Sequence, residues 1–143
     1  MESSKNNTAK VVYTGATTTT GGRQGASKSS DGHLDISLTP PGGRGEGTNP
    51  EQLFAAGWSA CFLGALGISA ASKNIKLPAE SSIDAEVDLV LSETEGYSLQ
   101  VRLNISLPGI DREEALAIAE HAHTICPYSK AIKGNIKVET NIL

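Results

Sequence analysis

Two stretches of alternating apolar and polar residues predict the longest strands of the chain. The alternation runs through residues 83–91 and again through residues 99–107, with a turn-forming segment at residues 92–96 between them. Because side chains on a strand point to opposite faces in turn, each stretch has one apolar face and one polar face. We therefore expect a two-stranded hairpin whose apolar face covers a helix.

Shorter signals of the same kind precede these strands. Residues 10–13, rich in Val and Tyr, predict a first strand, and the alternation at residues 34–38 predicts another. A glycine-rich turn at residues 21–25, with Arg23 at its tip, and the Asp31-Gly32 turn separate the strand segments. These features predict an antiparallel N-terminal sheet, preceded by flexible residues 1–8.

A long uncharged helix is predicted to begin at Asn49-Pro50, which combine a good N-cap with Pro at the first helical position. Residues 53–72 contain no charged side chain, and twelve of these twenty residues are Ala, Gly or Ser. The length matches a membrane span, but the small polar residues and the lack of one-sided basic flanks favour a buried central helix. Its three glycines predict that another backbone packs closely against it.

The second helix is expected to start near Asp111 and Glu114, which have capping-box spacing, and to run to about residue 125. Cys126-Pro127 ends it, because a residue before Pro avoids the helical region. A final strand is predicted around Ile136 and Val138. The pattern as a whole indicates an α+β fold with a single domain over residues 1–143.

Composition narrows the function classes. The chain has 12 Lys and Arg against 16 Asp and Glu, a net charge of −4, which disfavours binding to nucleic acids or anionic membranes. Two cysteines are too few for the disulfide scaffold of a secreted domain, and the first residues, MESSKNN, lack an apolar signal-peptide core. We expect a cytoplasmic protein.

The two cysteines are the main candidates for chemistry. Cys61 lies in the small-residue helix and Cys126 at a junction between a helix and a turn. The plain alternative is that both are buried small hydrophobes. Arg23 on its glycine-rich turn and Glu51 in the first turn of the helix offer a different interpretation, since a cation near a thiol lowers its pKa and creates a reactive thiolate.

Five short motifs follow one another along the chain: GGRQG at residues 21–25, SDG at 30–32, GTNPEQLFAAG at 47–57, ACF at 60–62 and CPYS at 126–129. In this order they resemble the organic hydroperoxide resistance proteins (Ohr) of the Ohr/OsmC family, and the resemblance extends over residues 10–143. The segment GTNPEQLFAAG with its trailing ACF is the most specific part. One departure is Trp58, where Tyr is expected more often. The resemblance implies an α+β fold of the Ohr/OsmC kind, with antiparallel sheets packed on a buried central helix.

The resemblance implies a thiol-dependent peroxidase for organic hydroperoxides that uses neither metal nor flavin. It implies that Cys61 is the peroxidatic cysteine, Cys126 the resolving cysteine, and Arg23 and Glu51 the polar pair that tunes Cys61. It also implies recycling by an external dithiol, such as dihydrolipoamide or a lipoylated protein. The side chains expected along the approach to Cys61, where they would favour alkyl over hydrogen peroxide, are Leu53, Phe54, Trp58 and Phe62.

The uncharged helix also predicts an intertwined homodimer, because one sheet of a small chain covers mainly one side of such a helix. Glu51 and Cys61 are ten residues apart, or about 15 Å along a helix axis. Two copies packed antiparallel would bring Glu51 of one chain toward Cys61 of the other, with Arg23 reaching across. A bent loop within one chain is the alternative.

Other functions are weighed against the peroxidase. A non-enzymatic redox sensor could use the same two thiols, and the OsmC branch of the family differs in substrate preference. His121 and His123 with Cys126 resemble a metal-ligand set, but helical residues two apart face roughly opposite sides. The glycines at residues 42–47 lack the GK[ST] that follows a phosphate-binding loop.

Overall fold

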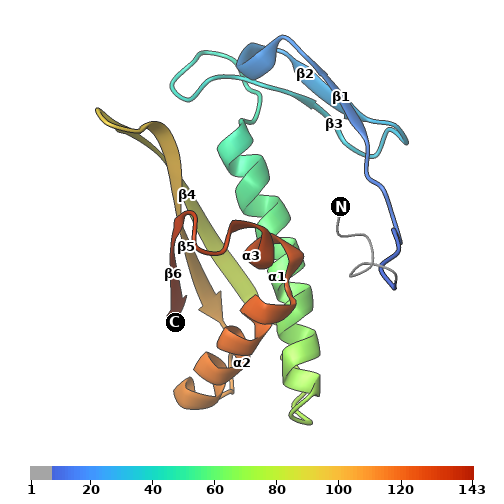
Figure 1. Ribbon diagram of the computed structural model, residues 1–143, viewed down its shortest axis with the longest axis vertical. Coiled ribbons are helices and arrows are strands. Elements are labelled where there is room, and N and C mark those ends of the chain that lie inside the picture. Colours follow the sequence, from blue (N-terminus) through green and yellow to red (C-terminus); the bar gives the residue numbers. More distant parts are fainter. Residues whose placement is uncertain (1–7) are drawn as a thin grey trace. The chain divides into compact units, whose positions relative to one another are not determined.

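The computed structural model describes residues 8–143, which form two compact units (Figure 1). The N-terminal unit ends at Asn49, and the C-terminal unit runs from Pro50 to Leu143. The predicted flexible segment, residues 1–8, lies outside the described residues except for Thr8. The single domain remains a prediction, because two compact units do not by themselves show two domains.

The N-terminal unit contains the predicted antiparallel sheet. Its strands β1 (Thr17–Thr20), β2 (Ala26–Ser29) and β3 (Asp35–Ser37) lie in the order β1-β2-β3. The first strand was expected at residues 10–13, and this was wrong. The Thr run is itself β-branched and pairs with β2, whereas Val11, Val12 and Tyr13 lie outside any strand with 82%, 83% and 77% of their surface exposed.

The glycine-rich turn joins β1 to β2 through a short 3-10 helix, Gly22–Gln24, that contains Arg23. Gly21 has a φ of 75°, a left-handed conformation that suits glycine. A Cβ at Gly25 would overlap the carbonyl oxygen of Thr20, so this position has no room for a side chain. The glycines therefore fix the shape of the turn on which the arginine lies.

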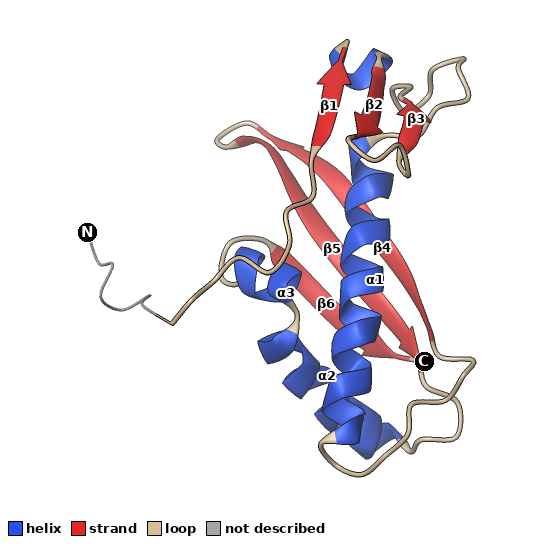
Figure 2. Cartoon of the chain, turned by 90° about the vertical axis from the view of Figure 1, so that its right-hand side faces the viewer, coloured by secondary structure: helices blue, strands red, loops and turns tan. Residues whose placement is uncertain are grey.

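The C-terminal unit combines a long helix with a three-stranded sheet (Figure 2). Helix α1 (Pro50–Ala71) begins at the predicted residue, and β4 (Ser82–Ser92) pairs with β5 (Gly96–Ser106) in the predicted hairpin. The last strand, β6 (Lys137–Ile142), runs parallel to β5, a direction that periodicity alone did not indicate. The sheet order is β4-β5-β6.

Two further helices connect β5 to β6. Helix α2 (Arg112–Ile125) starts at the predicted cap, where the Asp111 carboxylate accepts a 2.8 Å hydrogen bond from the Glu114 backbone N–H. The Glu114 side chain instead forms an ion pair of 3.2 Å with Lys73, which links α2 to the end of α1. Cys126 ends α2 with an extended backbone, as expected before Pro127, and also precedes the short helix α3 (Pro127–Ile132).

Helix α1 is buried on one side only within this chain, in agreement with the expectation that one small chain covers mainly one side of it. It contacts β4, α2 and α3. The opposite side of the helix is exposed in the chain, with Ile68 at 59%. The buried residues of α1 are Trp58, Phe62, Ala65, Leu66, Ser69 and Ala70. The exposed ones beyond its first turn are Ala56, Ala60, Gly64, Ile68 and Ala71.

The glycines of α1 do not all have the close backbone neighbour that was expected. A Cβ at Gly57 would lie 2.8 Å from the hydroxyl oxygen of Tyr128, so the close neighbour there is a side chain. A Cβ at Gly64 or Gly67 would meet nothing within 4 Å among the described residues. The expectation of close backbone packing is therefore wrong for Gly57, and Gly64 and Gly67 leave open surface.

Helix α1 also has the length and composition of a membrane span, with a mean hydropathy of 1.6 in its most apolar window. The core helix of a soluble protein passes the same test. Its side chains join the hydrophobic core of the C-terminal unit together with residues of β5 and α2. This packing supports the interpretation of α1 as a core helix.

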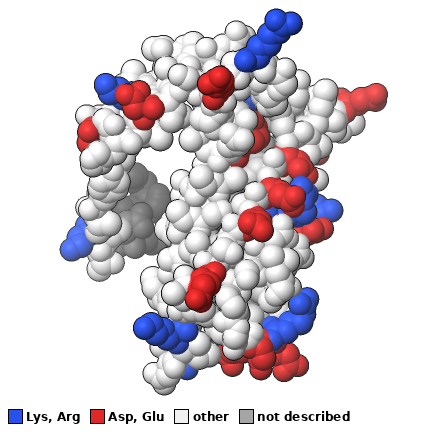
Figure 3. All heavy atoms as spheres, turned by 180° about the vertical axis from the view of Figure 1, so that it is seen from behind, with Lys and Arg blue, Asp and Glu red and all other residues white. Residues whose placement is uncertain are grey.

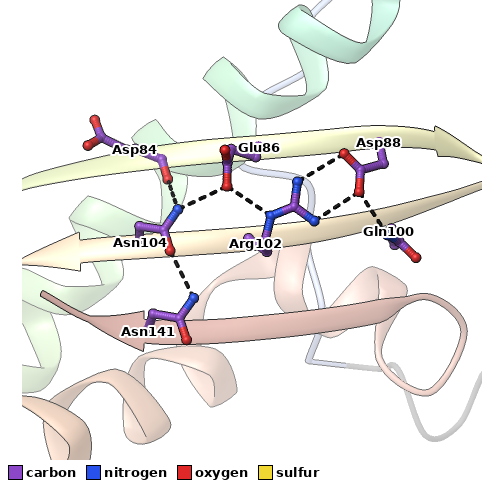
Figure 4. Close-up of polar contacts among 7 residues, drawn as sticks. All are labelled: Asp84, Glu86, Asp88, Gln100, Arg102, Asn104 and Asn141. Atoms are coloured by element: carbon purple, nitrogen blue, oxygen red, sulfur yellow. Dashed lines mark hydrogen bonds and ion pairs between the residues drawn. The ribbon is translucent and has the colours of Figure 1, made fainter.

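The polar face of the hairpin carries a network centred on Arg102 (Figure 4). Its guanidinium donates to both carboxylate oxygens of Asp88, at 2.8 and 2.9 Å, and to Glu86 at 2.8 Å. Gln100 donates a further hydrogen bond of 2.7 Å to Asp88. Arg102 and then Gln100 lower the pKa of Asp88 from 3.8 to about 2.

Replacing Asp88 should therefore have an effect that depends on pH. A carboxyl group with a lowered pKa stabilises the fold above its unfolded-state pKa and loses this contribution as pH falls through the folded-state value. We expect Asp88→Asn to lower the free energy of unfolding at neutral pH, with a difference from wild type that shrinks between about pH 4 and about pH 2. Urea unfolding across this range measures the difference.

Asp84→Asn is the matched control. Asp84 contributes its backbone carbonyl, not its carboxylate, to the hydrogen bond from Asn104. An equal pH dependence in both variants would contradict the assignment to Asp88.

Candidate functional site

The two cysteines lie together, as a pair of reduced thiols, at a junction of three helices. Cys61 is in the middle of α1 and half-buried, while Cys126, between α2 and α3, is fully buried. The thiol of Cys126 donates a hydrogen bond of 3.2 Å to the sulfur of Cys61. A disulfide requires a sulfur separation of about 2.05 Å, so a small shift suffices to form the bond.

The surroundings of Cys61 act on its pKa in opposite directions. Burial raises the pKa of Cys61, and the adjacent Cys126 sulfur, whose own charge would repel a Cys61 thiolate, raises it further. The backbone N–H of Tyr128 donates to Cys61 and lowers the pKa. The net direction is upward, so a reactive thiolate requires an additional stabilising group such as a cation.

The CPYS segment is held over α1 by its aromatic residue. Pro127 occupies the first turn of α3, where its missing N–H costs nothing. Tyr128 then lies over Gly57, one turn before Cys61, and its ring is 6.3 Å from that of Phe54. A glycine at residue 57 allows this approach, which brings the N–H of Tyr128 to the sulfur.

A hydrogen-bonded chain of side chains connects the helices that hold the two cysteines, and no sequence motif indicated it. Trp58 Nε1 donates to Ser129 Oγ at 3.1 Å. His123 Nδ1 is 2.8 Å from the same hydroxyl, and His123 Nε2 is 2.9 Å from Thr140 Oγ1. The His123 ring also lies against Phe62, with centroids 4.5 Å apart. Burial lowers the pKa of His123, which favours its neutral form.

This chain forms one wall of an open cavity of about 760 Å³ in the C-terminal unit. The residues that line the cavity do not include either cysteine. Its apolar wall comes from Ile132, Ile136 and Val138, and its charged groups are Lys130, Lys133 and Glu120. All four side chains of the hydrogen-bonded chain therefore contribute to the lining of this cavity.

The two histidines of α2 face different neighbours, as their spacing predicts. His121 Nδ1 is 3.1 Å from the hydroxyl of Ser69 on α1, whereas His123 bonds to Ser129 and Thr140. Among the described residues, no group of three or more His, Cys, Asp or Glu is placed to hold a metal ion.

The other predicted site residues are distributed over both units. Arg23 is in the N-terminal unit, and Glu51 is in the first turn of α1, ten residues before Cys61. Of the expected substrate-contacting residues, two are fully buried and two half-buried. Trp58 and Phe62 have no exposed surface, while Leu53 and Phe54 are accessible in part.

Comparisons with known proteins show the family of the chain. The family model described as OsmC-like protein matches residues 43–141. The organic hydroperoxide resistance protein of Xanthomonas axonopodis pv. citri (strain 306) is 48% identical over 133 residues, which cover 90% of this chain and 93% of that protein. The chain belongs to the OsmC-like family of organic hydroperoxide resistance proteins.

Solved structures of similar proteins show the same fold. The crystal structure of OhrB of Bacillus subtilis superimposes with a TM-score of 0.88 at 40% identity and covers 93% of this chain and 100% of that chain. An OsmC-like protein from Mycoplasma pneumoniae, at 16% identity and a TM-score of 0.74 over 93% of this chain and 98% of its own, shares the fold alone. The predicted α+β fold of the Ohr/OsmC kind is confirmed.

The sulfur geometry predicts an intrachain disulfide. We expect oxidation of the purified protein with diamide to link Cys61 to Cys126, because the sulfurs start 3.2 Å apart. Mass spectrometry of a non-reduced digest would detect the linked peptides. Cys61→Ser and Cys126→Ser proteins serve as controls without the link, and chain-to-chain disulfides as the main wild-type product would contradict the prediction.

Proposed function

We propose that the protein is a thiol-dependent peroxidase that reduces organic hydroperoxides to alcohols. The carrying observation is the reduced cysteine pair, one thiol accessible in part and the other buried, with sulfurs 3.2 Å apart. The relatives named for organic hydroperoxide resistance support this choice of substrate class.

The chemistry proceeds in three steps. The Cys61 thiolate attacks the distal oxygen of the hydroperoxide, the O–O bond breaks, and the alkoxide leaves and takes up a proton to give the alcohol. Cys61 is then a sulfenic acid. The Cys126 thiol attacks that sulfur, a disulfide forms and water leaves. A dithiol reduces the disulfide by exchange and is itself oxidised to a disulfide.

Arg23 and Glu51 are proposed to prepare Cys61 for the first step. A guanidinium next to the sulfur opposes the effect of burial, which raises the pKa of Cys61, and also stabilises the developing alkoxide. A carboxylate can hold a guanidinium by two parallel hydrogen bonds, which is the role given to Glu51. Family resemblance supports both assignments.

An apolar approach favours alkyl or fatty-acid hydroperoxides over hydrogen peroxide. Leu53 and Phe54, half-buried near the start of α1, are the candidates for contact with substrate. Trp58 and Phe62 are completely buried, so we assign them to support of this surface from below.

The proposal includes no resident metal or flavin, since the two sulfurs carry both electrons of each cycle. An external dithiol supplies the electrons, and the family resemblance favours dihydrolipoamide or a lipoylated protein. A reducing cytoplasm, where such dithiols occur, is the proposed location.

The active unit is proposed to be a homodimer. The exposed side of α1 is apolar, and a Cβ at Gly64 or Gly67 would meet nothing within 4 Å among the described residues. Figure 3 shows that charged side chains are unevenly distributed on one face of the molecule, with acidic and basic groups gathered along one side and a largely uncharged area beside them. A second α1 packed antiparallel on this side would cover it and carry Glu51 of one protomer toward Cys61 of the other.

The second candidate is a redox sensor that uses the same thiol pair. A sensor is oxidised once per pair, whereas an enzyme consumes many equivalents of hydroperoxide when a dithiol is supplied. A peroxide-consumption assay with dihydrolipoamide, thioredoxin and glutathione separates the two candidates and identifies the preferred reductant.

The cysteines should have separable roles. We expect Cys61→Ser to abolish reduction of cumene hydroperoxide, because the attacking sulfur is lost. Cys126→Ser should still undergo the first oxidation and accumulate a sulfenic acid or an over-oxidised form at Cys61. Mass spectrometry after one equivalent of hydroperoxide shows which sulfur reacted, and oxidation of Cys126 with a reduced Cys61 would reverse the roles.

Arg23→Ala should raise the pKa of Cys61 and slow peroxide attack. A charge-assisted contact is worth about 1.5–3 kcal/mol, or roughly one to two powers of ten in thiolate stability. Titration of the thiolate absorbance in a Cys126→Ser background measures the pKa, and Arg23→Lys tests the contribution of charge alone. An unchanged pKa and an unchanged rate would remove Arg23 from the site.

Mixed dimers test the shared site. We expect inactive Cys61→Ser and inactive Glu51→Ala protomers to regain activity when combined, because one complete site then contains wild-type residues from both chains. Differently tagged protomers allow purification of the mixed dimer before the assay. A fully active monomer, or verified mixed dimers without activity, would contradict the arrangement.

A further inference from the structure

We propose that the chain of hydrogen bonds Trp58–Ser129–His123–Thr140 positions the Cys61–Cys126 pair for disulfide formation. We call these four residues the support chain. The inference rests on the proposed function for the role of the disulfide, and it adds positioning residues that do not themselves touch the reacting sulfurs.

The support chain ties together every element that holds a cysteine. Trp58 lies on α1 one helical turn before Cys61, and His123 lies on α2 one turn before Cys126. Ser129 is in the first turn of α3, just after Cys126, and Thr140 is on β6. A change in the distance between α1 and the α2–α3 junction must therefore stretch at least one of these bonds, at 2.8 to 3.1 Å.

The donors and acceptors of the support chain are compatible with one another. The indole N–H of Trp58 can only donate, so Ser129 Oγ accepts from it. In the tautomer with the proton on Nε2, Ser129 donates to His123 Nδ1 and Nε2–H donates to Thr140 Oγ1, and in the other tautomer both directions are reversed. Either tautomer is a neutral imidazole, in agreement with the pKa of His123, which burial lowers.

Burial makes the Trp58–Ser129 contact geometrically demanding. Trp58 is completely buried and Ser129 is 5% exposed, so the loss of either partner leaves a buried polar group without a hydrogen bond. If these positions served only to fill space, apolar side chains would fill it without the cost of burying polar groups. Among the described residues, no buried side-chain N or O atom lacks a hydrogen-bond partner, so the junction is satisfied in one specific arrangement.

The chemical consequence concerns the second step of the cycle. When the Cys126 thiol attacks the Cys61 sulfenic acid, the S–S bond forms, the S–O bond breaks, and hydroxide leaves with the thiol proton as water. The sulfurs must close from 3.2 Å to about 2.05 Å. A support chain that limits movement of the two backbones keeps the effective concentration of one thiol at the other high.

The test measures this effective concentration directly. Each variant is equilibrated in glutathione redox buffers, quenched with acid, and scored for the Cys61–Cys126 disulfide by mass spectrometry. Thr140→Val keeps the side-chain shape and removes the hydroxyl that binds His123, and Ser129→Ala removes the central hydroxyl. Because the assay contains no hydroperoxide, its result is independent of whether the protein is a peroxidase.

The matched control is His121→Gln. His121 also links α2 to α1, through Ser69, but it belongs to a different set of contacts. Urea unfolding of each reduced variant gives its stability. We expect Thr140→Val and Ser129→Ala to lower the effective concentration at least tenfold. Ser129→Thr, which keeps a hydroxyl at this position, should retain the wild-type value. His121→Gln should leave the effective concentration unchanged even if it lowers the stability.

Two outcomes would overturn the proposal. One is an effective concentration that stays within twofold of wild type in Thr140→Val, which preserves packing and is expected to fold. The other is an equal decrease in the support-chain variants and in His121→Gln, which would show that lost stability alone explains the effect.

Discussion

The meeting of two sulfurs at 3.2 Å depends on how closely one helix can approach the junction of two others. That approach is set at Gly57, where the absence of a side chain makes room for Tyr128, and is maintained by the indole of Trp58 one residue later. Steric space and a buried hydrogen bond, contributed by consecutive residues of α1, thus act on the same distance. Cys61 lies one turn further along the helix and takes its position from both.

Much of the fold could be predicted from sequence because its signals are local. Alternation over residues 83–91 and 99–107 located β4 and β5, and Asn49-Pro50, Asp111 and Cys126-Pro127 located helix ends. The pairing of Cys61 with Cys126 followed from family motifs, since no spacing in the chain connects residues so far apart. The assignment of the first strand failed because Val11, Val12 and Tyr13 have strand propensity but pair with no strand in the described part of the chain, whereas the threonines after them pair with β2.

The missed parts of the site are those that depend on tertiary contacts. His123 and Ser129 have no distinctive local pattern, and only the packing of α2 against β6 brings Thr140 to the imidazole. The sequence suggested the two histidines of α2 as possible metal ligands, whereas their partners in the structure are hydroxyl groups on three different elements. The one sequence feature that could have indicated them is their spacing, because His123 and Ser129 each lie three residues from Cys126 and therefore near it on a helix.

The parallel pairing of β6 with β5 has a consequence for the order of folding. The hairpin of β4 and β5 closes locally, whereas β6 reaches β5 through a connection that contains α2 and α3. Cys61 and Cys126 are themselves 65 residues apart in the chain. Contacts between residues so distant in sequence form slowly, because the entropy of closing a long loop is lost before the contact is gained. The thiol pair therefore belongs to the slowly assembled, non-local part of the fold.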